Sequence, residues 1–158
     1  MRLKHAEDFY IRALLMKVKL AEVMTSPSIS VHANAPFRDV VKLLHERRIR
    51  HLPVVNSNNE VVGVISQRDL YKIQPPHKNE DGVWVYDLDA IDDFILQNVM
   101  ILNPFTLSSE NTLAEAIGPM VRSKYGCIPV VDQDKKLCGI ITQFDILKIA
   151  YQILEEGK

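Results

Sequence analysis

The stretch VVGVISQRDL at residues 61–70 returns 76 residues further on as LCGIITQFDI at residues 137–146. The same shift brings two further pairs into register: PVV at 53–55 on PVV at 129–131, and LAEVM at 20–24 on LQNVM at 96–100. Chance does not place proline, glycine and aspartate in one ungapped register. The chain therefore contains an internal repeat.

Each copy predicts the order β-α-β-β-α, and hence an α+β (mixed α/β) fold. In the first copy we expect an extended run at 29–31, a helix from about 37 to 48, strands at 51–55 and 61–65, and a helix from Gln67 onward. In the second we expect an extended run at 105–107, a helix from about 112, strands at 127–131 and 137–141, and a helix to about Leu154. Pro119 predicts a kink or a restart in the first of these two helices.

The repeat also divides the chain. The expected parts are an N-terminal helix at 1–20, the first repeat at 21–73, a linker with a helix at 74–95, and the second repeat at 96–154. Within the linker, the run from Asp89 to Val99 looks helical. One repeat buries too little surface to be stable alone. The natural product is a pair of repeats around a pseudo-twofold axis, with two equivalent clefts.

Charge and hydropathy exclude several classes of partner. Lys and Arg total 19 against 20 Asp and Glu, which gives no electrostatic attraction to nucleic acid or to an anionic membrane. No apolar run approaches the ~20 residues that cross a bilayer. The N-terminus, MRLKHAEDFY, does not resemble a signal peptide.

The sequence offers little for metal or catalytic chemistry. Cys127 and Cys138 lie in apolar runs without CxxC spacing, which favours reduced core thiols in a cytoplasmic protein. The acidic run Asp87, Asp89, Asp92 and Asp93 suits the start and solvated face of a helix better than a metal site. Motifs of hydrolases, P-loop proteins, dinucleotide-binding folds and metalloproteases are missing, so we expect neither an enzyme nor a bound cofactor.

The sharpest local signal is a hydroxyl residue at the end of a strand with an aspartate three positions later. It occurs as Ser66 with Asp69 and as Thr142 with Asp145. One interpretation is structural, because Ser or Thr caps a helix and Asp stabilises its first turn. The other adds a ligand, since a carboxylate held there can accept hydrogen bonds from both hydroxyls of a ribose. The two interpretations are compatible.

A basic cluster, which includes Arg47 and Arg48, leads into the first copy's LPVV run. Arg50 and His51 lie beyond the helix end that cations favour, so they are candidates for a phosphate contact. The second copy has Gly126 and Cys127 at these positions. We therefore expect the two clefts to differ in affinity for anions.

These strings resemble a tandem pair of cystathionine-β-synthase (CBS) domains, also called a Bateman module. The resemblance covers about residues 20–150 and rests on PVV, a turn, and Gly-h-h-Ser/Thr-x-x-Asp, present twice at one spacing (h is an apolar residue). It implies two β-α-β-β-α units packed through their sheets, a homodimer, and a regulatory role. The implied ligand contains adenosine: AMP, ADP, ATP or S-adenosylmethionine.

The resemblance also assigns roles to residues. Asp69 and Asp145 would hold ribose hydroxyls with Ser66 and Thr142 beside them, and Arg50 and His51 would contact phosphate. The short strands at Ile29–Ser30 and Phe105–Thr106 would flank the adenine. The hypothesis is a stand-alone cytoplasmic sensor that acts on an unknown protein. The alternatives are a structural or interaction module without a ligand and, with less support, an enzyme or a DNA-binding regulator.

Overall fold

The protein consists of two compact units. The computed structural model describes residues 11–73 and 75–156. Unit 1 combines Met1–Ser28 with Phe105–Lys158, and unit 2 is Ile29–Pro104. Each unit contains one β-α-β-β-α succession, so the predicted α+β class with two repeats is confirmed.

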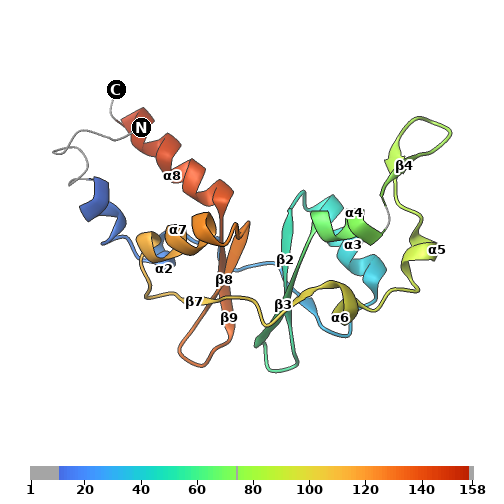
Figure 1. The fold of residues 1–158 in the computed structure, drawn as a ribbon, viewed down its shortest axis with the longest axis horizontal. Helices are drawn as coiled ribbons and strands as arrows, with labels where there is room; N and C mark the ends of the chain where they lie inside the picture. Colours follow the sequence, from blue (N-terminus) through green and yellow to red (C-terminus); the bar gives the residue numbers. More distant parts are fainter. Residues whose placement is uncertain (1–10, 74, 157–158) are drawn as a thin grey trace. The chain divides into compact units, whose positions relative to one another are not determined.

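Unit 2 is built on a four-stranded sheet in the order β1-β2-β3-β6. Its two longest strands, β2 and β3, form a hairpin (Figure 1). Its elements are β1 (Val31–His32), α3 (Phe37–Glu46), β2 (His51–Val55), β3 (Val61–Ser66), α4 (Gln67–Ile73) and β6 (Ile101–Leu102). β1 is parallel to β2, and β3 is antiparallel to both of its neighbours. Apolar residues of α3 recur at helical spacing and are buried against this sheet: Phe37, Val40, Val41 and Leu44.

Unit 1 repeats this plan around a three-stranded sheet in the order β7-β8-β9. Its elements are α2 (Leu20–Val23), β7 (Leu107–Ser108), α7 (Leu113–Arg122), β8 (Cys127–Val131), β9 (Leu137–Thr142) and α8 (Gln143–Glu156). An isolated antiparallel bridge joins Thr25 to Ile140. It occupies the place of the pair between Ile101 and Val64 in unit 2.

The two hairpins share one register, which explains why the repeat has no gap. His51 lies opposite Ser66 on β2 and β3, and Cys127 lies opposite Thr142 on β8 and β9. Each pair shifts register after the first valine of its VV, at Val54 and Val130. Because side chains alternate between the two faces of a strand, this common register gives both units the same buried face.

The segment that opens each repeat packs in the other repeat's unit. Leu20 is fully buried among residues of α7, β8 and β9 in unit 1, and Leu96 is buried in the core of unit 2. Met24 lies against Gly139, and Met100 lies against Gly63. Each unit is therefore completed by a segment that the sequence assigns to the other copy. The predicted domain boundaries, drawn from the repeat, remain predictions.

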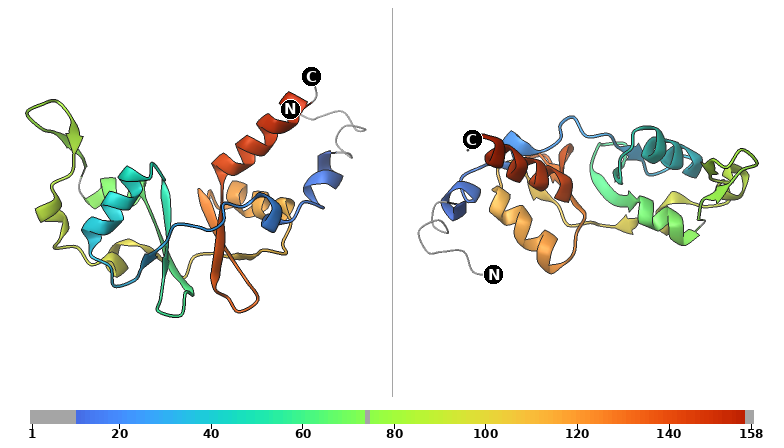
Figure 2. Two further views of the ribbon diagram at one scale, coloured as in Figure 1. Left: turned by 180° about the vertical axis from the view of Figure 1, so that it is seen from behind. Right: turned by 90° about the horizontal axis from the view of Figure 1, so that it is seen from above.

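The linker differs from its prediction. It forms β4 (His77–Lys78), β5 (Trp84–Val85), α5 (Leu88–Ile91) and α6 (Leu96–Val99). The hairpin of β4 and β5 points away from the sheet of unit 2 (Figures 1 and 2). The continuous helix expected from Asp89 to Val99 is wrong, because the chain leaves the helix between α5 and α6. The break lets Asp92 pair with Arg38 and places the Phe94 ring 6.1 Å from that of Phe37.

Three other expectations need correction or completion. The helix α7 runs through Pro119 without a restart, and Gly118 before it has no Cβ to crowd the proline ring. The first strand of each repeat begins two residues later than expected, at Val31 and Leu107. Of the expected N-terminal helix, residues 11–15 are helical and a turn follows at 16–17, whereas residues 1–10 lie outside the described part.

Among the described residues, no helix has the length and hydropathy needed to cross a membrane.

Candidate functional site

Ser66 and Asp69 form one closed arrangement where β3 meets α4. The Ser66 backbone N–H and hydroxyl both donate to Asp69 Oδ2, over 3.0 and 2.7 Å. The Asp69 side chain is 9% exposed. The predicted part of Asp69 is confirmed, because its carboxylate accepts the Ser66 N–H at the start of the helix.

Thr142 and Asp145 repeat this arrangement where β9 meets α8. The Thr142 backbone N–H and hydroxyl donate to Asp145 Oδ2 over 2.8 and 2.6 Å, and the Asp145 N–H donates back to the hydroxyl over 3.2 Å. Asp145 is as deeply buried as Asp69. The two copies therefore present the same carboxylate geometry from the same pair of elements.

In each carboxylate the fold engages one oxygen fully and the other less. Asp69 Oδ1 accepts a bond from Lys72 Nζ over 3.0 Å, and Asp145 Oδ1 accepts one from the Thr25 hydroxyl over 3.5 Å. A carboxylate oxygen can accept two hydrogen bonds. Oδ1 in both units can therefore accept a further donor, such as a ligand hydroxyl, without disturbing the helix cap.

The electrostatic surroundings keep Asp69 ionised. Burial acts to raise the pKa of its carboxyl, but hydrogen bonds from the Ser66 hydroxyl, from Lys72 and from the Ser66 amide outweigh burial and lower the pKa below its usual value. An ionised carboxylate is the form that accepts hydrogen bonds at both oxygens.

Arg50 and His51 lie next to this arrangement. Gln67 at the start of α4 donates its N–H to the Arg50 carbonyl over 3.0 Å, and His51 pairs with Ser66 across the sheet. Burial lowers the pKa of His51, and the charge of Arg50 adds to this effect, so the imidazole is neutral near pH 7. The Arg50 guanidinium is exposed and makes no ion pair with residues 11–73 or 75–156.

The same backbone contact in unit 1 carries different side chains. Gln143 donates its N–H to the Gly126 carbonyl over 3.2 Å and its side-chain amide to the Tyr125 carbonyl over 3.2 Å. Burial raises the pKa of the Cys127 thiol to about 12, so Cys127 is neutral. Gly126 and Cys127 therefore occupy the same structural positions in unit 1 that Arg50 and His51 occupy in unit 2, as the repeat predicted.

A hollow of about 530 Å³ opens beside Asp69. Its walls are Asp69, Lys72 and Ile73 with Phe94, Asn98 and Val99 from the linker and α6. Small-molecule sites commonly have volumes of about 300–1,000 Å³. Asp69 thus lines a space large enough for a nucleoside.

Comparison with known proteins agrees with this geometry. A family model described as the CBS domain matches residues 20–75 and again residues 96–151. The chain belongs to the CBS domain family. Its two CBS domains stand in tandem, as the sequence predicted.

Relatives of this CBS pair include proteins of similar and of greater length. A CBS domain-containing protein of Dictyostelium discoideum is 27% identical over 144 residues, which cover 89% of this chain and 96% of that protein. The A-adding tRNA nucleotidyltransferase of Aquifex aeolicus is 27% identical over 155 residues, but the chain spans only 17% of that enzyme.

The solved structures resemble the whole pair. CBSX2 from Arabidopsis thaliana is 26% identical with a TM-score of 0.71, covering 87% of this chain and 97% of that one. CBSX2 has also been solved in complex with AMP; that structure is 25% identical with a TM-score of 0.69, covering 86% of this chain and 98% of that one.

The remaining predicted residues of this CBS pair lie beside the two sites. Ile29 and Ser30 precede β1, and since β1 is parallel to β2 they run toward the end of β2 that holds His51. Phe105 and Thr106 precede β7 in the same way, and the Phe105 ring stacks on that of Tyr125 at 5.9 Å.

Sequence reasoning missed three residues of the sites. Lys72 could have been found, because it falls on Lys148 in the repeat. Tyr125 directly precedes Gly126, but nothing in the sequence marks its stacking on Phe105. Thr25 lies 120 residues from Asp145, and only the fold brings the two together.

The acidic run in the linker is structural, as expected. Asp87 Oδ1 accepts bonds from the backbone N–H groups of Asp89 and Ala90 at the start of α5, and Asp92 pairs with Arg38. Within residues 11–73 and 75–156 there is no cluster of three or more metal-ligating side chains.

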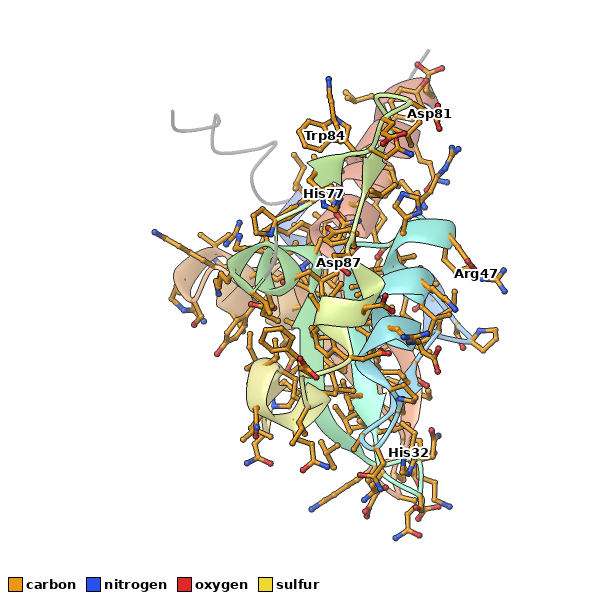
Figure 3. The ribbon with its side chains drawn as sticks, turned by 90° about the vertical axis from the view of Figure 1, so that its right-hand side faces the viewer. His32, Arg47, His77, Asp81, Trp84 and Asp87 are labelled. Carbon is orange, nitrogen blue, oxygen red and sulfur yellow. The ribbon has the colours of Figure 1, made fainter. Side chains whose placement is uncertain are left out.

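A separate cavity of about 380 Å³ lies between α3, α4 and the linker. Val41, Leu44, His45, Gln67, Leu70, Tyr71, Pro76, Trp84 and Tyr86 line it. Trp84 stands on the hairpin of β4 and β5 near His77 (Figure 3) and is 60% exposed. Its lining residues share no motif that would mark the cavity in the sequence.

Proposed function

We propose that this CBS pair is a regulatory protein that binds an adenosine-containing ligand through Asp69 and Asp145. The proposal rests on the different hydrogen bonding of the two oxygens in each carboxylate. Oδ2 holds the start of a helix, and Oδ1 can still accept a hydrogen bond from a ribose hydroxyl. AMP, ADP, ATP and S-adenosylmethionine all carry that ribose. This chain matches CBSX2 over nearly the whole length of CBSX2, which has been solved with AMP. Among the four compounds, AMP is therefore the favoured ligand.

A thermal-shift panel of these four compounds at about 1 mM tests the proposal. A ligand at 100 times its dissociation constant stabilises the folded state by ~2.7 kcal/mol, which raises the Tm by roughly 5–10 °C for a chain of this size. We expect one adenosine compound to give such a shift. A flat panel, with no compound raising the Tm, would reject ligand binding in favour of a structural module.

The double variant Asp69→Asn/Asp145→Asn should lose this shift and stay folded. Asparagine keeps one oxygen for the cap, but it replaces Oδ1 with an amide group that donates and cannot accept. The matched control is Asp39→Asn, which changes an aspartate in the first turn of α3, outside the sites. A shift that survives in the double variant would contradict the assignment of these carboxylates.

The regulatory action requires a partner, and we propose that the protein acts on another protein as a homodimer. Large apolar side chains of α8 remain exposed at 3-4-3 spacing: Phe144, Leu147, Tyr151 and Leu154. This spacing forms one stripe along a helix and suits pairing with a second helix of the same kind. The identity of the regulated protein and a location in the cytoplasm stay predictions.

The glutamate variant Leu147→Glu should convert the dimer to a monomer, because it places a charge at the centre of the stripe. Analytical ultracentrifugation at micromolar concentration measures the change. Val83→Glu is the matched control, since Val83 is also more than half exposed but lies in the linker of unit 2. A monomeric wild type, or an unchanged dimer in Leu147→Glu, would remove α8 as the interface.

A further inference from the structure

The surroundings of the two carboxylates differ in charge although their geometry is the same. Lys72 and Lys148 occupy equivalent positions of the repeat. Lys72 Nζ bonds Asp69 Oδ1 at 3.0 Å, whereas Lys148 Nζ lies over the Phe144 ring, 4.9 Å from its centroid. Phe144 occupies the position that Arg68 has in the first copy, and its ring engages Lys148. Asp145 Oδ1 therefore accepts its bond from the neutral Thr25 hydroxyl and not from a lysine.

Further cations gather on the Asp69 side. The Arg50 carbonyl accepts the N–H of Gln67 at the start of α4, and Arg68 directly precedes Asp69. Arg50 has an exposed guanidinium, and Lys72 lines the hollow beside the carboxylate. A guanidinium and an ammonium bind phosphate through charge-assisted hydrogen bonds. The environment of Asp69 therefore suits a ligand that carries negative charge next to its ribose.

Around Asp145 three of the corresponding positions carry no charge, although Lys148 keeps the place of Lys72. Gly126, Cys127 and Phe144 replace Arg50, His51 and Arg68. The Tyr125 ring, stacked on Phe105, is fixed at the start of α8 by the two bonds from Gln143 to the Tyr125–Gly126 backbone. With Lys148 engaged by the Phe144 ring, this aromatic pair favours an uncharged planar ligand, because a phosphate taken from water needs charged donors in return.

We infer that the two sites select different ligand classes: Asp69 takes a phosphorylated nucleoside, and Asp145 takes an uncharged nucleoside. This inference rests on the proposed function and adds a chemical distinction between its two sites. Arg50 and Lys72 favour phosphate binding at Asp69. The contact of Lys148 with Phe144 disfavours phosphate binding at Asp145. The protein would then report on the ratio of two adenosine compounds and not on one concentration.

Isothermal titration calorimetry of the full chain with AMP and with adenosine tests the inference. Adenosine should bind with an unchanged Kd when AMP is saturating. Asp69→Asn should weaken AMP by about tenfold or more and leave adenosine within about twofold, and Asp145→Asn should do the reverse, since hydrogen bonds to charged groups are worth that much. The asparagine variants preserve the caps, and a thermal melt checks their folding.

A variant that removes one positive charge beside Asp69 completes the test. Arg50→Gly installs the residue of the second copy and should weaken AMP by about tenfold with adenosine unchanged. Arg47→Ser is the matched control, because it also exchanges an arginine for its repeat counterpart, but Arg47 points away from the protein (Figure 3). Competition of AMP with adenosine for one site, or unchanged AMP affinity in Arg50→Gly, overturns the inference while the proposed function stands. If neither compound nor any other adenosine ligand binds the wild type, both fail.

Discussion

Replacing Leu20 with alanine should destabilise the protein by about 2–5 kcal/mol, the range for large-to-small changes in a packed core. Leu20 is the first residue of the first CBS domain in sequence, yet it is completely buried in the core of unit 1. Its N–H donates to the Asn111 carbonyl over 2.8 Å, which fixes α2 against the loop before α7. Truncation therefore leaves a cavity that the anchored backbone cannot close. Urea unfolding followed by circular dichroism gives the free energy.

Two further leucine variants serve as a parallel case and as a control for this prediction. Leu96→Ala, at the equivalent place in unit 2, should have an effect of similar size, since Leu96 is 1% exposed. Leu154→Ala should change the unfolding free energy by less than about 0.5 kcal/mol in the monomer, because Leu154 is 70% exposed. A Leu20→Ala protein as stable as Leu154→Ala would mean that α2 does not pack in unit 1.

Replacing Gly139 with valine should destabilise the protein by about 1–3 kcal/mol, although valine favours strands. A Cβ at Gly139 would overlap the Met24 sulphur and approach Met24 Cγ and Cε to 3.0 and 3.1 Å. The glycine thus leaves room for the close approach of the Met24 side chain from the first repeat's segment. Thermal and urea unfolding measure the loss.

Shortening the methionine should relieve this overlap. In a double-mutant cycle, Met24→Ala/Gly139→Val should be more stable than the sum of the single effects by roughly 1 kcal/mol, because the residues are in contact. Gly63→Val with Met100→Ala repeats the cycle in unit 2. Strict additivity in both cycles would show that the methionines do not determine the need for glycine.

The repeat allowed the two hairpins and the caps to be predicted, because these depend on residues close in sequence. Ser66 and Asp69 are three positions apart, and their hydrogen bonds follow from the geometry of a helix start. The linker helix failed for the opposite reason. Apolar spacing from Asp89 to Val99 suits a helix locally, but the contacts of Asp92 with Arg38 and of Phe94 with Phe37 bend the chain between two short helices.

The site was predictable only in its local part for the same reason. Asp145 and Thr142 could be named from the motif, whereas the contact with Thr25 depends on how the first segment returns to β9. Lys72 and Lys148 are the same residue at equivalent positions, and their neighbours decide their contacts. Phe144 in place of Arg68 gives Lys148 a ring to lie on.

The division of the chain into units also determines how it carries mechanical load. The chain enters unit 2 after Ser28 and leaves it before Phe105, so unit 2 is an insertion within unit 1. Tension between the N-terminal segment and α8 therefore acts first on the contacts that hold this segment in unit 1. They include the backbone bonds of Leu113 to Val18, of Leu20 to Asn111, of Ala21 to Ser109 and between Thr25 and Ile140. While these contacts hold, they shield residues 29–104 from the pull. The inserted unit, with Arg50 and Asp69, can keep its shape while force passes through the other.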